Sequence, residues 1–288
     1  MRENAQRFDT RQNMHNKEFE VFHYREPKPQ AVEVHDHDFY EVYFLLNGDV
    51  SYWVEGKVYS LEPGDFLLIN PSTLHRPIIS EESSVYERIV LWINKEYLEN
   101  FKENDLSLNQ CFESVNDNTN NLIRVSSPQN QAELTSLLAA LVRENYSDEF
   151  YNNFCAKSIF MQFMIKLNRI LLKKEASSKT AFELSQNDLV SNVLDYISDH
   201  YNEELSLQML ASKYYVSKYH LSHEFTKKVG SSVYRYIMLK RLTAARQMLF
   251  EHITPGEVCF KCGFKDYTSF FRAFKAEYGI SPKDINKQ

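Results

Sequence analysis

The fold of the C-terminal part of this chain is decided by LSLQMLASKYYVSKYHLSHEFTKKVG, residues 205–230, and by its near repeat TPGEVCFKCGFKDYTSFFRAFKAEYG, residues 254–279. Each copy holds a small residue, a short turn, two large apolar residues four positions apart, and a closing glycine. This order is the packing signature of a helix-turn-helix. The matching anchors are Ala211, Leu221, Phe225 and Gly230 in the first copy, and Cys259, Phe270, Phe274 and Gly279 in the second. The sequence therefore predicts two helix-turn-helix units, whose large apolar anchors recur 49 residues apart.

A single uninterrupted helix is predicted between the two units. Residues 232–250 contain neither Gly nor Pro and carry one apolar stripe, formed by Val233, Ile237, Leu242, Ala245 and Leu249. Its basic residues are expected to face outward; they are Arg235, Lys240, Arg241 and Arg246. About nineteen helical residues span about 28 Å, close to the roughly 34 Å between successive major grooves on one face of B-DNA. The connector therefore predicts two recognition helices in adjacent grooves, and hence a chain that reads DNA.

Residues 205–283 resemble the DNA-binding domain of the AraC/XylS transcription regulators. The motifs that carry the resemblance are Arg241-Leu242, Ala245, Met248-Leu249, Cys262-Gly263-Phe264, Asp266, Thr268, Phe270, Arg272, Phe274-Lys275 and Gly279-Ile280-Ser281-Pro282. Ser269 and Phe271 depart from the family's usual residues at positions that concern sequence preference. The resemblance implies a regulator whose partners are promoter DNA, a small-molecule effector and the transcription machinery.

Base-reading residues are expected at the start of each recognition helix, because a helix-turn-helix places its N-terminal residues on base edges. The outward positions are Lys218, Tyr219, Ser222 and His223 in the first unit, which match the family's base-reading positions, and Tyr267, Thr268, Phe271 and Arg272 in the second. Arg272 is the strongest candidate, because its guanidinium can bond guanine O6 and N7 together. A phosphate contact or a salt bridge is the alternative for Arg272, and packing is the alternative for Phe271.

The charge of the chain is divided between two segments. The 288 residues carry a formal net charge of −6, which argues against a uniformly basic DNA-binding protein. Residues 205–288 hold 14 Lys and Arg against 6 Asp and Glu, a net charge of +8, whereas the remainder is at −14. Such asymmetry predicts a nucleic-acid module joined to an acidic domain. We expect an effector-binding and dimerisation domain over residues 1–172, a linker over residues 173–187 and a DNA-binding domain over residues 188–288.

The N-terminus and the cysteines predict a cytoplasmic protein. Residues 1–17 are polar and lack the apolar stretch of a secretory signal, and no run of eighteen apolar residues predicts a membrane span. Four cysteines in 288 residues suit a reducing compartment. Cys259 and Cys262 have the spacing of a redox or zinc half-site. Because both occupy core positions in the helix-turn-helix register, we expect buried, inert thiols.

Residues 18–94 predict β structure. Short apolar runs at 19–22, 40–46, 50–54 and 66–69 are separated by turn pairs such as Asn47-Gly48, Glu55-Gly56 and Pro63-Gly64. Strands of this length and spacing are typical of a sandwich or a small barrel.

A set of polar residues lies within these predicted strands. His35, His37 and Glu41 share one parity, so in a continuous strand they face the same side, and His75 follows later. The pattern resembles that of the cupin barrel, whose members often bind a divalent metal through three histidines and a glutamate. Two glycines of that pattern are replaced here, by Pro29 and Ser72. Three roles stay open for the set: effector contacts, a bound metal, or structural histidines.

A sugar or a related small polar molecule is the expected effector, because AraC-like sensor domains commonly use this barrel for such ligands. The residues expected to contact it are His35, His37, Glu41, Tyr43, His75 and Arg88. Tyr43 shares the parity of Glu41, whereas the facing of Arg88 is less defined. Trp53 or Trp92 is expected to stack on a sugar face. No cofactor is expected, and the alternative is a metal at His35, His37, Glu41 and His75.

Two amphipathic helices are predicted after a polar, irregular stretch over residues 95–129. Their apolar positions are Leu134, Leu137, Leu138 and Leu141, then Phe160, Phe163, Met164, Leu167, Ile170 and Leu171. Two interpretations are open: the helices cover the open end of the barrel, or they form the seam of a homodimer. The homodimer is favoured, since sensor domains of the family often pair through helices here.

The predicted fold class is α+β in two domains: an N-terminal cupin-like β-barrel with a helical dimerisation segment, and a C-terminal all-α tandem helix-turn-helix domain. The predicted function is a ligand-responsive, sequence-specific DNA-binding transcription regulator, with no membrane partner. The alternatives are a metal-dependent cupin enzyme with an appended DNA-binding module, and a metal-sensing regulator. The prediction is against an enzyme, because only the His and Glu set suggests chemistry and an enzyme does not need two reading helices.

Overall fold

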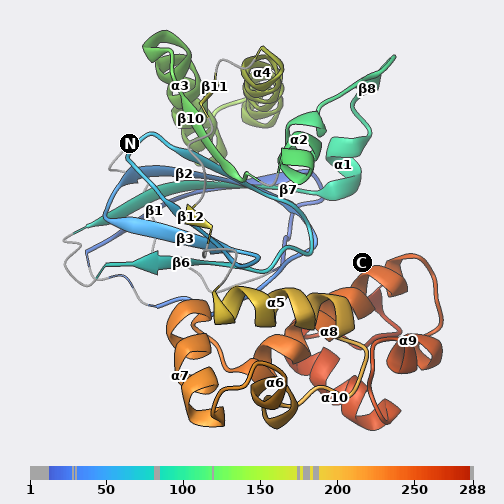
Figure 1. The fold of residues 1–288 in the computed structure, drawn as a ribbon. Coiled ribbons are helices and arrows are strands. Elements are labelled where there is room, and N and C mark those ends of the chain that lie inside the picture. Colours follow the sequence, from blue (N-terminus) through green and yellow to red (C-terminus); the bar gives the residue numbers. More distant parts are fainter. Residues whose placement is uncertain are drawn as a thin grey trace.

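A computed structural model describes residues 13–27, 29, 31–80, 85–118, 120–173, 176–177, 182–183 and 188–285. A sheet-rich N-terminal part, here called the sensor domain, lies above an all-helical C-terminal part, here called the DNA-binding domain (Figure 1). The predicted α+β organisation is thereby confirmed. None of the helices in the described ranges combines the length and the apolar composition that spanning a bilayer requires.

Two large antiparallel sheets form the body of the sensor domain, beside the small two-stranded sheet β8-β9. The larger has the strand order β1-β7-β2-β5-β10-β11 and the smaller the order β12-β4-β3-β6. The strands are β1 (Phe19–Glu26), β2 (Tyr40–Asn47), β3 (Val50–Val54), β4 (Lys57–Ser60), β5 (Phe66–Ile69), β6 (His75–Ile79), β7 (Tyr86–Ile93), β10 (Leu122–Val125), β11 (Ala176–Ser177) and β12 (Phe182–Glu183). Gly48 and Gly56 turn the chain between β2, β3 and β4 with φ of +133° and +88°, as the two turn pairs predicted.

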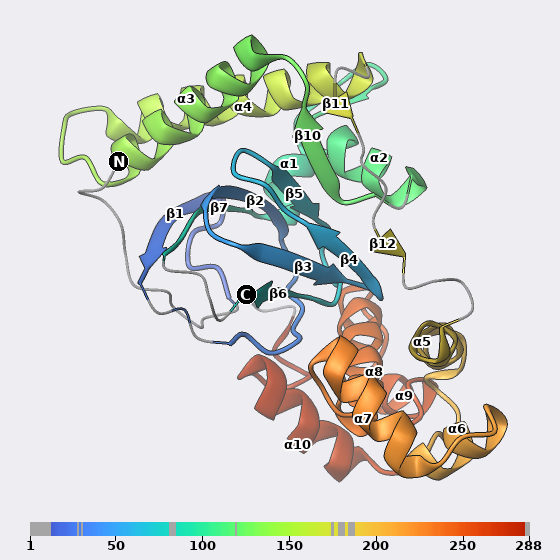
Figure 2. The same ribbon diagram turned by 60° about the vertical axis from the view of Figure 1, so that its left-hand side comes forward.

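The two faces of the six-stranded sheet carry different residues, because successive side chains of a strand point to opposite sides. Val42 and Phe44 of β2 pack outward against helices, whereas Tyr43 belongs to the cluster between the two sheets. The helices on the outer face are α2 (Gln110–Asn118), α3 (Pro128–Asn145) and α4 (Asn152–Leu172) (Figure 2). The interpretation that the last two cover the open end of a barrel is therefore wrong: they cover the back of a sheet.

The stretch 95–129 is more regular than its polar composition predicted. It contains α1 (Lys95–Glu99), the short hairpin β8 (Lys102–Glu103) and β9 (Leu106–Ser107), then α2 and β10. Buried residues such as Leu98, Phe112 and Ile123 fix these elements in the core beneath α3 and α4. Widely spaced single apolar residues thus order a segment whose average composition is that of a loop.

The DNA-binding domain confirms the two predicted helix-turn-helix units. Its helices are α5 (Leu189–His200), α6 (Leu207–Lys213), α7 (Lys218–Val229), α8 (Val233–Phe250), α9 (Pro255–Lys261) and α10 (Tyr267–Tyr278). Ser217 and Asp266 cap the N-termini of α7 and α10 by accepting backbone N–H bonds, and Gly230 and Gly279 end these helices in the left-handed conformation. Gly263 turns the second unit at φ +77°, where a Cβ would collide with the backbone of Asn202.

The second unit buries its sulfur atoms as predicted. Cys259 and Cys262 are both 0% exposed and lie in a cluster with Leu242, Phe270 and Phe274. Burial raises the pKa of the Cys262 thiol to about 12. These thiols therefore act as small apolar core residues.

One apolar cluster joins the two domains. It combines Val34, Trp53 and Leu74 of the sensor domain with residues of α5, α7 and α8. The Trp53 ring meets the Tyr236 ring of α8 edge to face at 6.2 Å. Most of the predicted linker lies outside the described residues, and its described parts, β11 and β12, pair with β10 and β4.

Phe163→Ala is predicted to lower the free energy of unfolding by about 3–5 kcal/mol, because it leaves a cavity between α4 and the sheet. Phe163 is fully buried and faces Phe66 at a ring distance of 6.3 Å. Gln162→Ala on the same helix is the control, since the Gln162 side chain is exposed. Urea unfolding followed by circular dichroism measures both, and equal losses would contradict this account of the core.

Candidate effector site and DNA-reading surface

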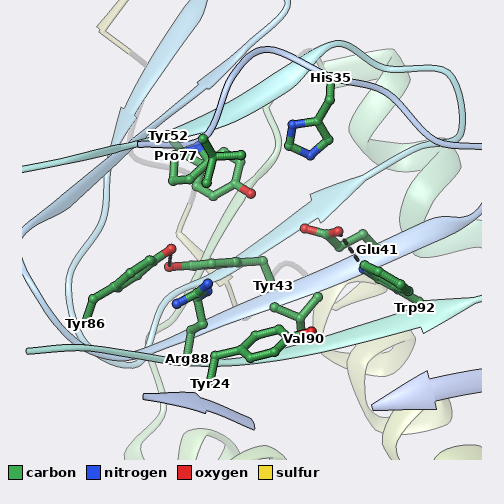
Figure 3. Close-up of a pocket in the computed structure, with 11 residues that line it drawn as sticks. Tyr24, His35, Glu41, Tyr43, Tyr52, Pro77, Tyr86, Arg88, Val90 and Trp92 are labelled. Atoms are coloured by element: carbon green, nitrogen blue, oxygen red, sulfur yellow. Dashed lines mark hydrogen bonds between the residues drawn. The ribbon is translucent and has the colours of Figure 1, made fainter. Parts of the chain in front are cut away.

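A small cavity lies between the two sheets of the sensor domain, with a volume of about 40 Å³ (Figure 3). It is lined by Tyr24, Val32, His35, Glu41, Tyr43, Tyr52, Pro77, Tyr86, Arg88, Val90 and Trp92. The structure thus brings four of the six expected contact residues onto one cavity. Parity explains this, because Glu41 and Tyr43 alternate along β2, and Arg88, Val90 and Trp92 alternate along β7.

Paired polar groups line the wall of this cavity. Trp92 Nε1 donates to Glu41 Oε2 at 2.9 Å, and the hydroxyls of Tyr43 and Tyr86 are 2.8 Å apart. Arg88 lies over the Tyr86 ring, 4.0 Å from its centroid, and its Nη1 donates to Glu26 at 2.7 Å. Figure 3 shows a carboxylate and an imidazole at one end and the tyrosine–arginine group at the other. The cavity therefore offers both hydrogen-bond donors and acceptors.

The sequence did not single out the aromatic residues Tyr24, Tyr52 and Tyr86 as part of this site. Tyr86 and Tyr24 lie on β7 and β1, so the same parity rule applied to these strands would have found them. Trp53 was expected near the effector, and the structure instead places it against Tyr236 at the domain interface. Alternation along β3 explains the error, because Tyr52 faces the cavity and its neighbour faces away.

His35 and His37 do not lie in one continuous strand with Glu41, as their shared parity had assumed, because β2 begins only at Tyr40. His35 and His37 precede β2, and His35 pairs with His75 of β6 through two backbone hydrogen bonds of 3.2 and 3.0 Å. This single bridge brings the His35 and His75 rings to a centroid distance of 4.4 Å. The histidines converge because two segments meet, and not because one strand alternates.

All three imidazoles are oriented in the same way. Each Nδ1 lies within 2.8–2.9 Å of a backbone carbonyl, namely that of Glu33, Phe39 or Thr73. Since a carbonyl only accepts, Nδ1 carries the proton and Nε2 of the neutral ring presents a lone pair. Nε2 of His37 and of His75 is buried without a hydrogen bond to the described residues. His37 Nε2 is 3.3 Å from Glu41 Oε2, but the geometry of a hydrogen bond is not met.

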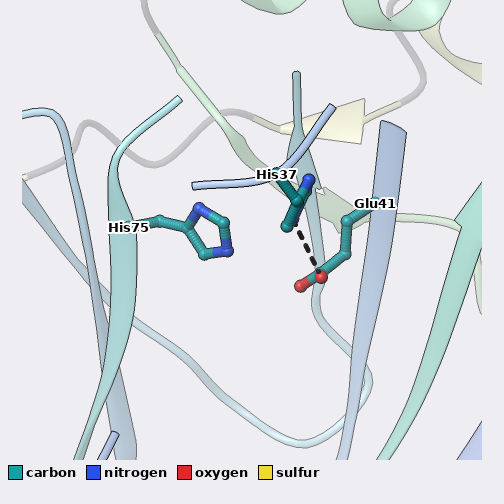
Figure 4. A group of neighbouring side chains, drawn as sticks. All are labelled: His37, Glu41 and His75. Atoms are coloured by element: carbon teal, nitrogen blue, oxygen red, sulfur yellow. Dashed lines mark ion pairs between the residues drawn. The ribbon is translucent and has the colours of Figure 1, made fainter. Parts of the chain in front are cut away.

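This donor set fits a divalent transition metal. Potential ligand atoms of His37, Glu41 and His75 lie within 4.8 Å of one another (Figure 4). Imidazoles whose Nδ1–H is fixed by a carbonyl are the form in which histidine usually binds metals, and a nearby carboxylate adds the charge. His35 stands beside this group without belonging to it, so three of the four expected ligands are placed together.

Burial favours the uncharged form of His35 and His75. It lowers the pKa of His75 well below its usual range and lowers the pKa of His35, and the nearby imidazoles act in the same direction. Two uncharged imidazoles are thus held near the Glu41 carboxylate.

The predicted DNA-reading residues lie at the N-terminal ends of α7 and α10. Lys218, Tyr219, His223, Thr268 and Arg272 are exposed, and Tyr219 is 82% exposed. Ser222, Phe271 and Tyr267 are half-buried. The Tyr267 ring packs on Phe270 and Phe271, and its hydroxyl is buried with no hydrogen bond to the described part of the chain.

The expectation that the basic residues of α8 face outward is wrong. Arg235 forms a bidentate pair with Glu277 of α10, at 2.6 and 3.0 Å. Arg241 donates to the backbone oxygens of Tyr201 and Glu203 at 2.7 and 2.6 Å. These two arginines bind neighbouring parts of the DNA-binding domain to α8.

The other two basic residues of α8 reach the sensor domain. Lys240 Nζ is 2.5 Å from Glu55 Oε2, and Arg246 Nη2 donates to Asp36 Oδ2 at 2.8 Å. Arg246 is only 4% exposed. The second half of the polar face of α8 is therefore an interdomain surface.

Sheets enclosing a polar cavity, followed by two helix-turn-helix units, define a ligand-binding transcription regulator. The sequence profile of the AraC-like ligand binding domain matches residues 16–164, and that of a helix-turn-helix domain matches residues 210–288. The chain belongs to the AraC family of transcription regulators.

Relatives of this chain carry the same description. The HTH-type transcriptional activator RhaS of Citrobacter koseri is 24% identical over 272 residues, 91% of each chain. The uncharacterized regulator YdiP of Escherichia coli K12 is 27% identical over 106 residues, and this match spans 36% of our chain and 35% of YdiP. Among solved structures, fatty-acid-bound ToxT of Vibrio cholerae is 14% identical with a TM-score of 0.40, covering 94% of this chain and 95% of that one.

The free energy of unfolding is predicted to fall as the pH drops from about 7 toward 5. His75 has a pKa below its ordinary 6.5, so at these pH values the unfolded chain takes up a proton that the folded chain refuses. Urea titrations across this range should show a smaller decline for His75→Gln, and an unchanged one for the control His220→Gln at an exposed position. An identical decline in His75→Gln would show that this histidine does not govern acid sensitivity.

Proposed function

We propose that this protein controls transcription in response to a sugar or a closely related polar molecule bound in the sensor cavity. The observation that supports this is the lining of the cavity. A carboxylate and neutral imidazoles accept hydrogen bonds, tyrosine hydroxyls both donate and accept, and an arginine donates, as hydroxyl-rich ligands require. The contacts proposed are His35, His37, Glu41, Tyr43, His75 and Arg88, with Trp92 as the aromatic wall.

The size of the cavity implies that binding moves the protein. A free volume of about 40 Å³ holds only a few water molecules. A hexose therefore enters only if part of the lining shifts. Val32, on the non-strand segment before β2, is the lining residue least constrained by strand pairing, and His35 on the same segment is held only by its bridge to His75. Effector binding and movement of this segment are thus one event.

Sequence-specific DNA contacts are proposed for the exposed N-terminal residues of α7 and α10. Lys218, Tyr219, Ser222 and His223 would read one major groove, and Thr268 and Arg272 the next, with Tyr267 and Phe271 at the edge of the second contact. Arg272 is exposed on the first turns of α10 and forms no ion pair with the described residues.

We further propose that the protein acts as a homodimer in the cytoplasm and contacts the transcription machinery. An exposed aromatic group at the α3–α4 turn supports the dimer; it consists of Phe150, Tyr151 and Phe154, which are 94%, 78% and 72% exposed. The four cysteines are free, as in a reducing compartment.

A metal-responsive regulator is the second candidate. The buried Nε2 lone pairs of His37 and His75 beside Glu41 favour it. These three side chains would hold the ion, which would accept the lone pairs of the two imidazole nitrogens. The family comprises transcription regulators rather than enzymes, and we propose no catalysis at this site.

Arg272→Ala is predicted to cost about 1–3 kcal/mol at a selected binding site and to relax base preference at one position. Lys275→Ala, an exposed position one turn later on α10, is the matched control and should weaken all duplexes equally. Fluorescence anisotropy on selected and random duplexes measures both, with circular dichroism as a check of folding. Equal losses on both duplexes for Arg272→Ala would assign this arginine to phosphate.

Glu41→Gln is predicted to weaken the affinity for the responsive sugar at least about tenfold, a loss of roughly 1.4 kcal/mol or more of binding free energy. The loss follows because a buried acceptor becomes a donor. A panel of pentoses, hexoses and deoxyhexoses is titrated by calorimetry, and Glu33→Gln, exposed on the same segment, serves as the control. Elemental analysis of the same sample decides between the candidates: no sugar heat together with stoichiometric metal would replace the sugar by the ion.

A further inference from the structure

Two short segments that contribute the histidines form a ribbon between the cavity and the DNA-binding domain. We call residues 34–37 and 74–77 the sensor ribbon. The backbone pair between His35 and His75 joins its two halves. Neighbouring side chains along each half point to opposite sides, as in any extended chain. The imidazoles of His35, His37 and His75 lie together on one side, where His35 lines the cavity, whereas Asp36 and Arg76 contact the DNA-binding domain on the other.

Asp36 holds the connector helix and the second recognition helix. Its carboxylate is 0% exposed and accepts from Arg246 at 2.8 Å and from Thr243 Oγ1 at 3.1 Å, both on α8. The Tyr278 hydroxyl, on the last residue of α10, donates to its other oxygen at 3.4 Å. The Arg246 guanidinium also lies over the Tyr278 ring, 4.7 Å from its centroid. One carboxylate from the sensor ribbon therefore joins α8 to the C-terminal end of α10.

Arg76 holds the first recognition helix in the same way. Its Nε donates to the backbone oxygen of Val229, the last residue of α7, at 2.7 Å. Gly230 follows with φ +78°, and a Cβ there would overlap the guanidinium of Arg76. The glycine that ends α7 thus also gives the sensor arginine its access to the helix end.

These contacts leave both reading ends free of the sensor domain. The ribbon holds the C-terminal ends of α7 and α10, and each helix of 12 residues is about 18 Å long. Figure 2 shows both helices running away from the sensor domain. Lys218, the first residue of α7, and Arg272, midway along α10, are exposed. The ribbon therefore positions the two helices without covering the surface that reads DNA.

We propose that the sensor ribbon couples the cavity to DNA: its inner face carries the effector-contacting histidines, and its outer face, through Asp36 and Arg76, sets the relative position of the two recognition helices. The role of the effector rests on the function proposed above. Two helices read a site together only when their spacing is fixed. The arrangement held by the Asp36 and Arg76 contacts is therefore the one that binds DNA well. An effector that shifts the segment before β2 changes the contacts of Asp36 with α8 and α10, and thereby the affinity for DNA.

Three variants of the full chain test this without an effector. Asp36→Asn removes the charge that Arg246 faces, and Arg76→Gln releases α7 alone. Asp38→Asn is the matched control. Like Asp36→Asn it removes one carboxylate charge, but at an exposed position two residues away. We expect Asp36→Asn and Arg76→Gln to bind a selected duplex about tenfold more weakly, within the 5- to 150-fold range typical of coupled sites. Asp38→Asn should stay within about twofold of the wild type, well below that range.

The two tryptophans supply a readout that a merely structural defect would not reproduce. Trp53 lies at the domain interface and Trp92 in the cavity, and the chain has 2 tryptophans in all. With 5-fluorotryptophan, ¹⁹F NMR gives one resonance for each, assigned through Trp53→Phe. Because coupling between sites is reciprocal, duplex DNA should shift the Trp92 resonance in the wild type and in Asp38→Asn, but not in Asp36→Asn.

The outcomes separate cleanly. The proposal would be overturned if Asp36→Asn and Arg76→Gln both bound DNA as tightly as the wild type or more tightly, with dispersed ¹⁹F spectra that show a folded chain. A DNA-induced Trp92 shift that persists in Asp36→Asn would overturn it as well. Should Asp36→Asn fail to fold, Arg76→Gln decides alone, because it removes one surface-side contact. None of these measurements uses an effector, so their failure is distinguishable from a failure of the sugar titration.

Discussion

The arrangement of the two domains depends on a buried carboxylate. Asp36 and Arg246 are both almost fully removed from water, which is costly unless each charge finds its partner. Burial opposes the Arg246 charge, yet Asp36 together with Tyr278, Asp38 and Glu277 outweighs it, so the pKa of Arg246 is raised. Such an ion pair adds little net stability, but any arrangement that separates the two buried charges is strongly unfavourable. The apolar contact around Trp53 is non-directional and would permit several positions of the sensor domain along α8. The buried ion pair fixes one of them, because Asp36 must lie opposite Arg246.

Features governed by local spacing could be read from the sequence. The anchors of the helix-turn-helix units and the terminal glycines each follow from a rule that spans only a few residues. Pairing of Glu41 with Tyr43 on one cavity wall follows equally from alternation along β2. These predictions needed no knowledge of which elements meet across the molecule.

Features that depend on distant partners could not be read in this way. The apolar stripe of α8 reveals one buried side, but this helix is enclosed by its own domain and by the sensor domain, so polar Arg246 and Thr243 are buried too. The sequence predicts an exposed position for Arg246, because its carboxylate partner Asp36 lies far away along the chain. The histidines converge through a backbone bridge between segments forty residues apart, and Trp53 serves the interface because it alternates with Tyr52. Each case turns on long-range contacts.

The six-stranded sheet separates two kinds of surface by the thickness of a single layer. Odd-numbered positions of β2, such as Glu41 and Tyr43, face the cavity, while even-numbered ones, such as Val42 and Phe44, anchor the helical pair on the back. Substitutions at the first set alter chemical recognition and leave the helical layer untouched, and those at the second set do the reverse. The lining of the cavity and the packing of the helical layer are therefore free to change independently during evolution, because neighbouring positions of one strand have different surroundings.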